Sequence, residues 1–431
     1  MKKRKWFLGA GILLALLGVA WIALLVWLPT DEELAVKAGA ELENRLGVPV
    51  KIGALHWSLF PTPAVVVTDA VTEQPQPITI RRLTLHPDVP ALMDGRFRMQ
   101  RAELEGAVVP QLSLRALDKG SAETTQRNPD ATPLERFVFR DVTWITRRGI
   151  PVIYDGDIDF DPNWRPRRAE LRRPDFKPAT DLVLTRQGEE DRWDVRIRVG
   201  GGTGDGEVQL QTRENGRMHL EGQLKPKAVE VSNALAAFNR KSVVAGEASG
   251  DTALSADGDT VGELAQSLHT RTVFSMGRST LLRFDLEKAV RSFGKEHAGQ
   301  TPLDAITGQL DTQNTPQGMV VTYTGLKASS GALTASGDVK IANRRIDAEF
   351  AVDLVDGIVG VPLKVTGPLE KVEVSAPKGA VAGAVLGTAV LPGVGTAIGA
   401  RLGATLGKIF SPDPAPGKGA AAPPTPKPAT R

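Results

Sequence analysis

Cysteine is absent from the 431 residues of the chain. Disulfide bonds, thiolate metal ligands and cysteine nucleophiles are therefore excluded together. A chain without cysteine suits an oxidising compartment without requiring one. Histidine is scarce as well, and its five copies lie far apart, at His56, His86, His219, His269 and His297. None has a second ligand at helical or strand spacing, so we interpret them as surface or strand residues.

Catalytic motifs are missing too, since the chain has no H-E-x-x-H, G-x-S-x-G or P-loop pattern. Four aspartates alternate from Asp155 to Asp161, as in a calcium loop. The EF-hand pattern requires glycine at its sixth and glutamate at its twelfth position, where this chain has Phe160 and Pro166. Ile158 and Phe160 alternate with the aspartates and would point to the opposite side of a strand. We therefore interpret the aspartates as the solvated face of that strand.

A glycine-rich run over residues 200–206 is the other segment that suggests a binding loop. Its spacing fits no dinucleotide fingerprint, and no helix is predicted after it. We interpret it as a flexible hairpin connection between Val199 and Glu207. Together these observations predict a protein that is not an enzyme and that holds no metal or cofactor.

Neither sign of charge dominates the chain, because 53 basic side chains face 50 acidic ones and leave a net charge of +3. Basic residues beyond the N-terminus are scattered among acidic ones, so we predict no nucleic-acid partner. The apolar fraction of 41% and the charged fraction of 24% are ordinary for a folded protein.

The longest apolar run is Trp6–Leu28, which carries no charge. At about 1.5 Å per residue it extends over roughly 35 Å, enough for a bilayer core. A cleaved signal peptide is the alternative, but the run exceeds the usual apolar region of about 7–15 residues and no A-x-A site follows. Basic residues Lys2–Lys5 precede the run and place the N-terminus in the cytoplasm. The residues that we assign to the anchor are Trp6, Leu16, Trp21 and Trp27.

The body after the anchor is predicted to be mainly β with a few short helices. A helix capped by Thr30 and Glu33 ends at Gly47, and alternating apolar residues then begin at Val48. Strands are predicted over 48–54, 64–68, 78–85, 102–114, 137–145, 151–160, 181–185, 193–199, 207–212, 217–224, 318–324, 332–341, 345–353 and 362–374. Short helices are predicted over 232–238, 262–268 and 284–293.

Glycine recurs at every fourth position in the segment 379–410, with one interruption beside Pro392. Such spacing lets two backbones approach closely, so we predict a helical hairpin. The hairpin either enters a membrane shallowly or closes one end of the β body, and a plain cap on the last strands is equally compatible. The candidate membrane or end contacts are Gly383, Gly387, Gly399, Gly403 and Arg401. Residues 411–431, rich in proline and alanine, are predicted to be a disordered tail.

Several segments resemble the AsmA family of bacterial envelope proteins. The opening resembles the family in Glu41–Val50 and in Leu55–Pro61, and Arg82–Gly106 is similar to the repeat that follows. Ser249–Ser255 and Pro362–Leu369 resemble its C-terminal half. The resemblance implies two β modules, 29–120 at the N-terminal side and 134–378 at the C-terminal side. The residues themselves predict the cytoplasmic end and anchor 1–28, a polar linker 121–133, the hairpin 379–410 and the tail 411–431.

The resemblance also implies an elongated, twisted, antiparallel sheet that forms a half-open groove with an apolar interior. It implies an inner-membrane protein with one span and a periplasmic body, which supports outer-membrane biogenesis. Its expected partners are the phospholipid bilayer, a phospholipid cargo, and outer-membrane or envelope assembly proteins. From the residues alone, the alternating apolar positions fit an ordinary sandwich core as well as a groove lined for acyl chains. A structural assembly factor that binds no lipid is the rival function.

The charge asymmetry across Trp6–Leu28 predicts the topology of the chain. Lys2–Lys5 precede the run, whereas three acidic residues at 31–33 follow it. A reporter that is active only in the periplasm should therefore be active when it is fused after residue 120. Activity of a cytoplasm-specific reporter at that position would show the opposite orientation.

Overall fold

The computed structural model describes residues 35–375, apart from 37–38, 41, 44–46, 59–61, 89, 92–97, 115–133, 163–164, 260, 316, 355–360 and 370. The predicted anchor, linker, hairpin and tail lie outside these residues and stay predictions. No helix in the described part of the chain is long and apolar enough to cross a membrane. Gly47 has the predicted left-handed conformation, φ 69°, and its N–H donates to the Glu43 carbonyl at 2.8 Å.

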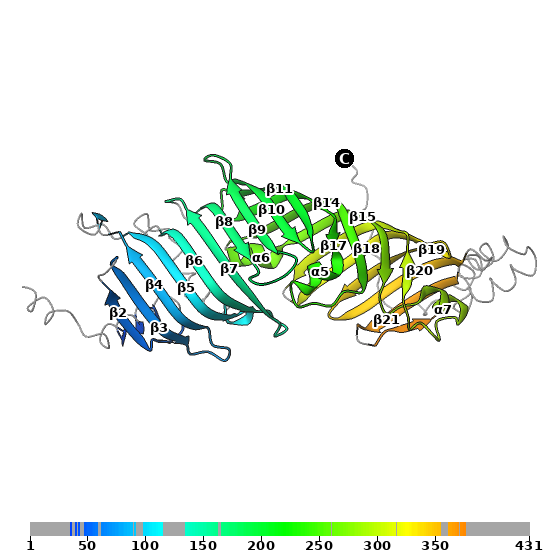
Figure 1. Ribbon diagram of the computed structural model, residues 1–431, viewed down its shortest axis with the longest axis horizontal. Coiled ribbons are helices and arrows are strands. Elements are labelled where there is room, and N and C mark those ends of the chain that lie inside the picture. Colours follow the sequence, from blue (N-terminus) through cyan, green and yellow to red (C-terminus); the bar gives the residue numbers. More distant parts are fainter. Residues whose placement is uncertain are drawn as a thin grey trace, which may run out of the picture. The chain divides into compact units, whose positions relative to one another are not determined.

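Strands dominate the described residues, and they belong to one mixed, open sheet of 22 strands (Figure 1). The strands are β1 (Val50–Lys51), β2 (Ala54–Ser58), β3 (Ala64–Thr72), β4 (Thr79–Pro87), β5 (Met99–Pro110), β6 (Leu134–Ile145), β7 (Pro151–Phe160), β8 (Pro166–Arg172), β9 (Asp181–Arg186), β10 (Arg192–Val199), β11 (Gly202–Thr212), β12 (Met218–Lys227), β13 (Val229–Glu230), β14 (Val244–Gly258), β15 (His269–Leu281), β16 (Thr301–Leu303), β17 (Ala305–Thr315), β18 (Gly318–Ser329), β19 (Leu333–Ala342), β20 (Arg345–Leu354), β21 (Val361–Pro368) and β22 (Glu373–Ser375). The helices are η1 (Gln111–Ser113), α5 (Val231–Ala236), α6 (Val261–Ser267) and α7 (Leu286–Arg291).

Most neighbouring strands are antiparallel, as predicted, but β5 and β6 are parallel, with Leu104 opposite Phe139. The prediction of a wholly antiparallel sheet is therefore wrong at this pair. A parallel pair needs a connection of a dozen residues or more to return along the strand. Residues 111–133 supply that length, whereas the other connections between β3 and β12 are shorter.

Three further predictions about strands need correction. The strand predicted over 102–114 ends at Pro110, which has no N–H to continue the ladder, and η1 follows. The strand predicted over 362–374 is interrupted near Gly367, φ 110°, and forms β21 and β22. Of the glycine run 200–206, only Gly200 and Gly201 form the turn, and β11 begins at Gly202.

Six strands were missed by the sequence interpretation: the short β13 and β16, and the longer β8, β14, β15 and β17. The sequences of the longer four contain many arginine, glutamate, threonine, serine and glycine residues, so their apolar alternation is weak. Each is nevertheless held by its neighbours, as β14 is by β12 and β8 is by β7 and β9. Tertiary pairing thus overrides a weak local preference.

The chain divides into two compact units, Met1–Gly277 with Asp311–Pro316, and Arg278–Leu310 with Gln317–Arg431. The second unit has a closed core, in which α7 packs on the apolar side of β19, β20 and β21. Val352 and Leu363 are buried there to 0% and 1% exposure. Asp285 caps α7 by accepting a hydrogen bond from the Lys288 backbone N–H at 2.9 Å.

The first unit has a small core at β2–β4, where Ala35 packs with Leu55, Val67 and Ala70. Beyond it, the strands from β4 to β12 follow one another in sequence order. Asp69, Gly106 and Asp141 have positive φ, but only Asp141 lies at a register shift, which falls between Phe139 and Val142 where β6 pairs with β7. Such a bulge bends the strand and increases its local twist.

Two glycines of β11 give a matched test of strand packing. A Cβ at Gly206 would collide with the Gln223 carbonyl oxygen of β12, whereas a Cβ at Gly204 meets Ile197 Cβ at an ordinary 3.8 Å. We expect Gly206→Ala to lower the free energy of unfolding by about 1–3 kcal/mol. Gly204→Ala should leave it unchanged or raise it by about 0.5 kcal/mol. Urea unfolding followed by fluorescence of the adjacent Trp193 measures both, and equal midpoints for the two variants would contradict the collision.

Candidate functional site

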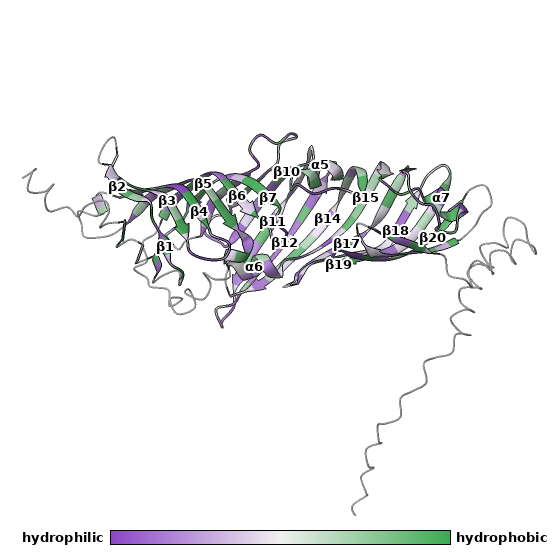
Figure 2. Cartoon of the chain, turned by 90° about the horizontal axis from the view of Figure 1, so that it is seen from below, coloured by the Kyte–Doolittle hydropathy of each residue, from purple (hydrophilic) through white to green (hydrophobic). Residues whose placement is uncertain are grey.

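The main candidate site is one face of the sheet in the first unit. In β10, Trp193, Val195 and Ile197 point to the same side, and their partners in β9 and β11 continue it. Register pairing carries this side across ten strands, from β4 to β14. Figure 2 shows green apolar positions alternating with purple polar positions along these strands. We call the following set the apolar face: Leu83, Leu104, Phe139, Ile158, Leu171, Leu182, Leu184, Trp193, Val195, Ile197, Val208, Leu220, Leu224 and Leu254.

The apolar face is only partly covered by the described residues. Trp193 and Val195 are buried, at 4% and 6% exposure, but the other twelve members stay partly exposed. The core of the second unit, by contrast, excludes solvent from its central side chains. Contiguous apolar surface that is left partly exposed is typical of a binding surface for a protein, a membrane or an apolar ligand.

The opposite side of the same strands is charged and wet. Arg198 pairs with Asp181 at 2.6 Å, and Arg136 pairs with Asp157 at 2.5 Å. A hydrogen bond from each guanidinium to its aspartate raises the pKa of Arg136 and of Arg198. Cross-strand pairs of opposite charge stabilise neighbouring strands. The strands are therefore amphipathic, with one side available for apolar contact.

The alternating aspartates divide between the two environments. Asp155, Asp157 and Asp159 lie on the charged side and pair with arginines, as the prediction of a solvated face requires. The prediction is wrong for Asp161, whose side chain is 8% exposed and pairs with the equally buried Arg186 at 2.5 Å. Asp161 lies past the end of β7, where the alternation no longer applies. Among the described residues, no group of three or more histidine, aspartate or glutamate side chains is arranged to hold a metal ion.

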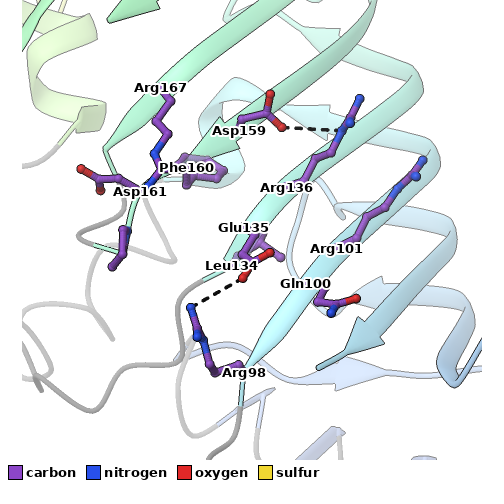
Figure 3. A pocket seen from close by; sticks show the side chains of 11 residues that line it. Arg98, Gln100, Arg101, Leu134, Glu135, Arg136, Asp159, Phe160, Asp161 and Arg167 are labelled. Carbon is purple, nitrogen blue, oxygen red and sulfur yellow. Dashed lines mark ion pairs between the residues drawn. The ribbon is translucent and has the colours of Figure 1, made fainter. Parts of the chain in front are cut away.

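A charged pocket of about 640 Å³ lies at the ends of β5–β8 where β6 begins (Figure 3). Its carboxylates each have an arginine partner, since Glu135 pairs with Arg98 at 3.5 Å and Asp159 pairs with Arg136 at 3.7 Å. The lining consists of Arg98, Gln100, Arg101, Leu134, Glu135, Arg136, Asp159, Phe160, Asp161, Pro162 and Arg167. It brings together no serine, histidine or lysine, and we interpret it as an ion-pair network that joins the strand ends.

The other end of the same strands carries an arginine on the apolar side. Arg173 follows β8 directly and continues its alternation, with its N–H donating to the Thr180 carbonyl at 2.9 Å. Its guanidinium carbon lies 6.0 Å from the ring centre of Tyr154 and 5.5 Å from that of Phe176. We call Tyr154, Arg173 and Phe176 the Arg173 cluster. Burial lowers the pKa of Arg173 and raises the pKa of Tyr154.

Helix α5 lies at this end of the strands, close to the cluster. Asn239, just after α5, donates from Nδ2 to the Pro151 carbonyl at 2.6 Å, at the first residue of β7. The positive charge of the neighbouring Arg240 acts on Tyr154 and lowers its pKa against the larger effect of burial. Glu230 caps α5 through its carboxylate, which accepts from the Asn233 N–H at 2.6 Å.

The sequence interpretation did not find the Arg173 cluster, and its own candidate residues lie outside the described part of the chain. Trp6, Leu16, Trp21, Trp27, Gly383, Gly387, Gly399, Gly403 and Arg401 all belong to that group. One feature of the sequence could have revealed the cluster: Arg173 follows Ala169 and Leu171 at every second position, where an apolar residue is expected. It was hidden because β8 is mostly charged.

Comparison with known proteins gives no relative for this chain. No protein-family model matches it, and neither a curated protein nor a solved structure matches it. The resemblance to the AsmA family thus depends on segments such as Glu41–Val50 and Pro362–Leu369 alone.

The cap of α5 makes a pH-dependent contribution to stability. Burial raises the pKa of Glu230, but hydrogen bonds from Gly246, Ser232 and Asn233 outweigh it and hold the pKa below its usual range. Glu230→Gln should cost about 1 kcal/mol of unfolding free energy near neutral pH. Because the folded-state pKa is the lower one, the stabilisation is present above the unfolded pKa and is lost as the pH falls through the folded pKa. Urea midpoints across that range measure it, with Glu247→Gln, exposed on the neighbouring strand, as the control.

Proposed function

We propose that the protein is a non-enzymatic lipid-binding protein of the bacterial inner membrane, anchored by residues 1–28 and with a periplasmic body. Phospholipid acyl chains lie on the apolar face, while headgroups remain in water, and binding or transfer of these lipids supports outer-membrane biogenesis. The observation that supports this proposal is a partly exposed apolar face that continues over ten strands with a charged opposite side.

The dimensions of the face suit acyl chains. Ten strands about 4.8 Å apart extend over roughly 40 Å. Half of a bilayer core, about 15 Å, corresponds to one extended acyl chain, so such a chain covers about three strands. Each buried CH₂ group contributes about 0.8 kcal/mol, which makes a whole chain a strong ligand for a continuous face.

A structural assembly factor remains the rival function. The observation that favours it is apolar exposure on the other side of the sheet, where Val273 of β15 is 60% exposed and alternates with the inward Thr272. A protein partner that docks on the sheet would cover such side chains and would need no lipid.

Site-specific photo-crosslinking in β9 separates these functions. A benzophenone amino acid at Leu184 lies on the apolar face, and the same amino acid at the adjacent, exposed Thr185 lies on the charged side. In the full chain within bacterial membranes, we expect phospholipid adducts at position 184 and few at position 185. Mass spectrometry identifies the adducts. Protein adducts alone at position 184, or equal lipid adducts at both positions, would reject the lipid-binding function.

A further inference from the structure

The Arg173 cluster holds a cation that has no counter-ion among the described residues and lies beside an apolar surface. The Nε and Nη1 atoms of Arg173 are buried and have no hydrogen-bond partner among the described residues. Arg186, which faces the same side from β9, is by contrast paired with Asp161. Burying two guanidinium nitrogens without hydrogen-bond acceptors is costly, and the two flanking rings offset only part of that cost.

No acidic side chain of the described residues forms an ion pair with Arg173, and Asp175, two residues further on, is exposed to solvent. Three other acidic side chains of this region have partners of their own. Asp181, in the strand paired with β8, accepts from Arg198, and Asp155 of β7 pairs with Arg172 on the charged side. Glu230 of the α5 cap accepts from Asn233, Ser232 and Gly246. Arg240 adds a second positive charge near Tyr154. The surroundings of Arg173 therefore favour an anion that comes from outside the chain.

We propose that the Arg173 cluster binds the oxyanion of an amphiphile whose acyl chain lies on the apolar face. This assignment rests on the proposed lipid-binding function and adds to it a preference for an anionic headgroup. Arg173 supplies the charge and the unpartnered N–H groups, since guanidinium groups bind phosphate and carboxylate oxygens by charge-assisted hydrogen bonds. Leu171 and Leu182, which pair directly beside the cluster, then receive the first methylene groups of the chain.

Headgroup preference can be measured at the crosslinking position Leu184. The full chain is reconstituted with an equimolar mixture of phosphatidylglycerol and phosphatidylethanolamine, and the ratio of the two adducts is determined by mass spectrometry. We expect phosphatidylglycerol to dominate and Arg173→Gln to lower the ratio about tenfold while total adducts persist, because charged hydrogen bonds are lost. Arg173→Lys should retain part of the preference.

Arg172→Gln is the matched control, because Arg172 is the preceding residue and points to the charged side, where it pairs with Asp155. It should leave the adduct ratio unchanged. Inorganic phosphate equimolar with the lipid should also leave it unchanged, and a loss of phosphatidylglycerol adducts in its presence would assign the site to free phosphate. Equal ratios in the wild type, Arg173→Gln and Arg172→Gln, with lipid adducts still present, would overturn the headgroup assignment alone. An absence of lipid adducts in all three proteins would instead reject the lipid-binding function.

Discussion

Cross-strand register is the constraint on which the rest of this structure depends. In a strand, successive side chains point to opposite sides, so a shift of one residue would move every apolar side chain to the charged side. The pairings from β4 to β14 keep Leu, Val, Ile and aromatic residues on one side over the whole series. The register of β3 with β4 and of β4 with β5 is the same on both sides of Asp69 and Gly106, so the apolar side is preserved beyond them.

Ion pairs on the charged side of the sheet favour the same strand register that keeps the apolar side chains together. Ion pairs such as Arg198 with Asp181 and Arg196 with Asp205 join adjacent strands only in the observed register. Exposed pairs of this kind contribute little individually, on the order of 0–1 kcal/mol. Their larger effect is on specificity, because a slipped register would place the arginines and aspartates against the apolar face, where desolvation is expensive.

A strand or helix could be predicted from the sequence only where its own residues show a clear hydrophobic periodicity. The β-rich class and the short helices near 232–238, 262–268 and 284–293 were predicted correctly from the sequence pattern. The caps that Glu230 and Asp285 supply to two of these helices were not predicted. β14 and β15 were missed because Thr252 and Thr272 stand where an apolar residue would reveal the alternation, and they instead bond to each other at 2.9 Å. The parallel pair β5–β6 and the buried Asp161 depend on residues distant in sequence, which no local pattern contains.

The Arg173 cluster, too, could not be predicted from a local sequence pattern. Tyr154 comes from the first half of β7, Arg173 from the end of β8, and Phe176 from the connection to β9, so only the fold brings them together. Near it the apolar face also lacks side chains at Gly202, Gly204 and Gly206, whose partner positions in β10 are Val199, Ile197 and Val195. Glycine is needed at positions 202 and 206 because a Cβ there would collide with the carbonyl oxygens of Ala228 and Gln223, so the strands of this part of the face approach each other closely. A partly exposed apolar surface therefore ends at Arg173, and an amphiphile with an anionic headgroup matches both features.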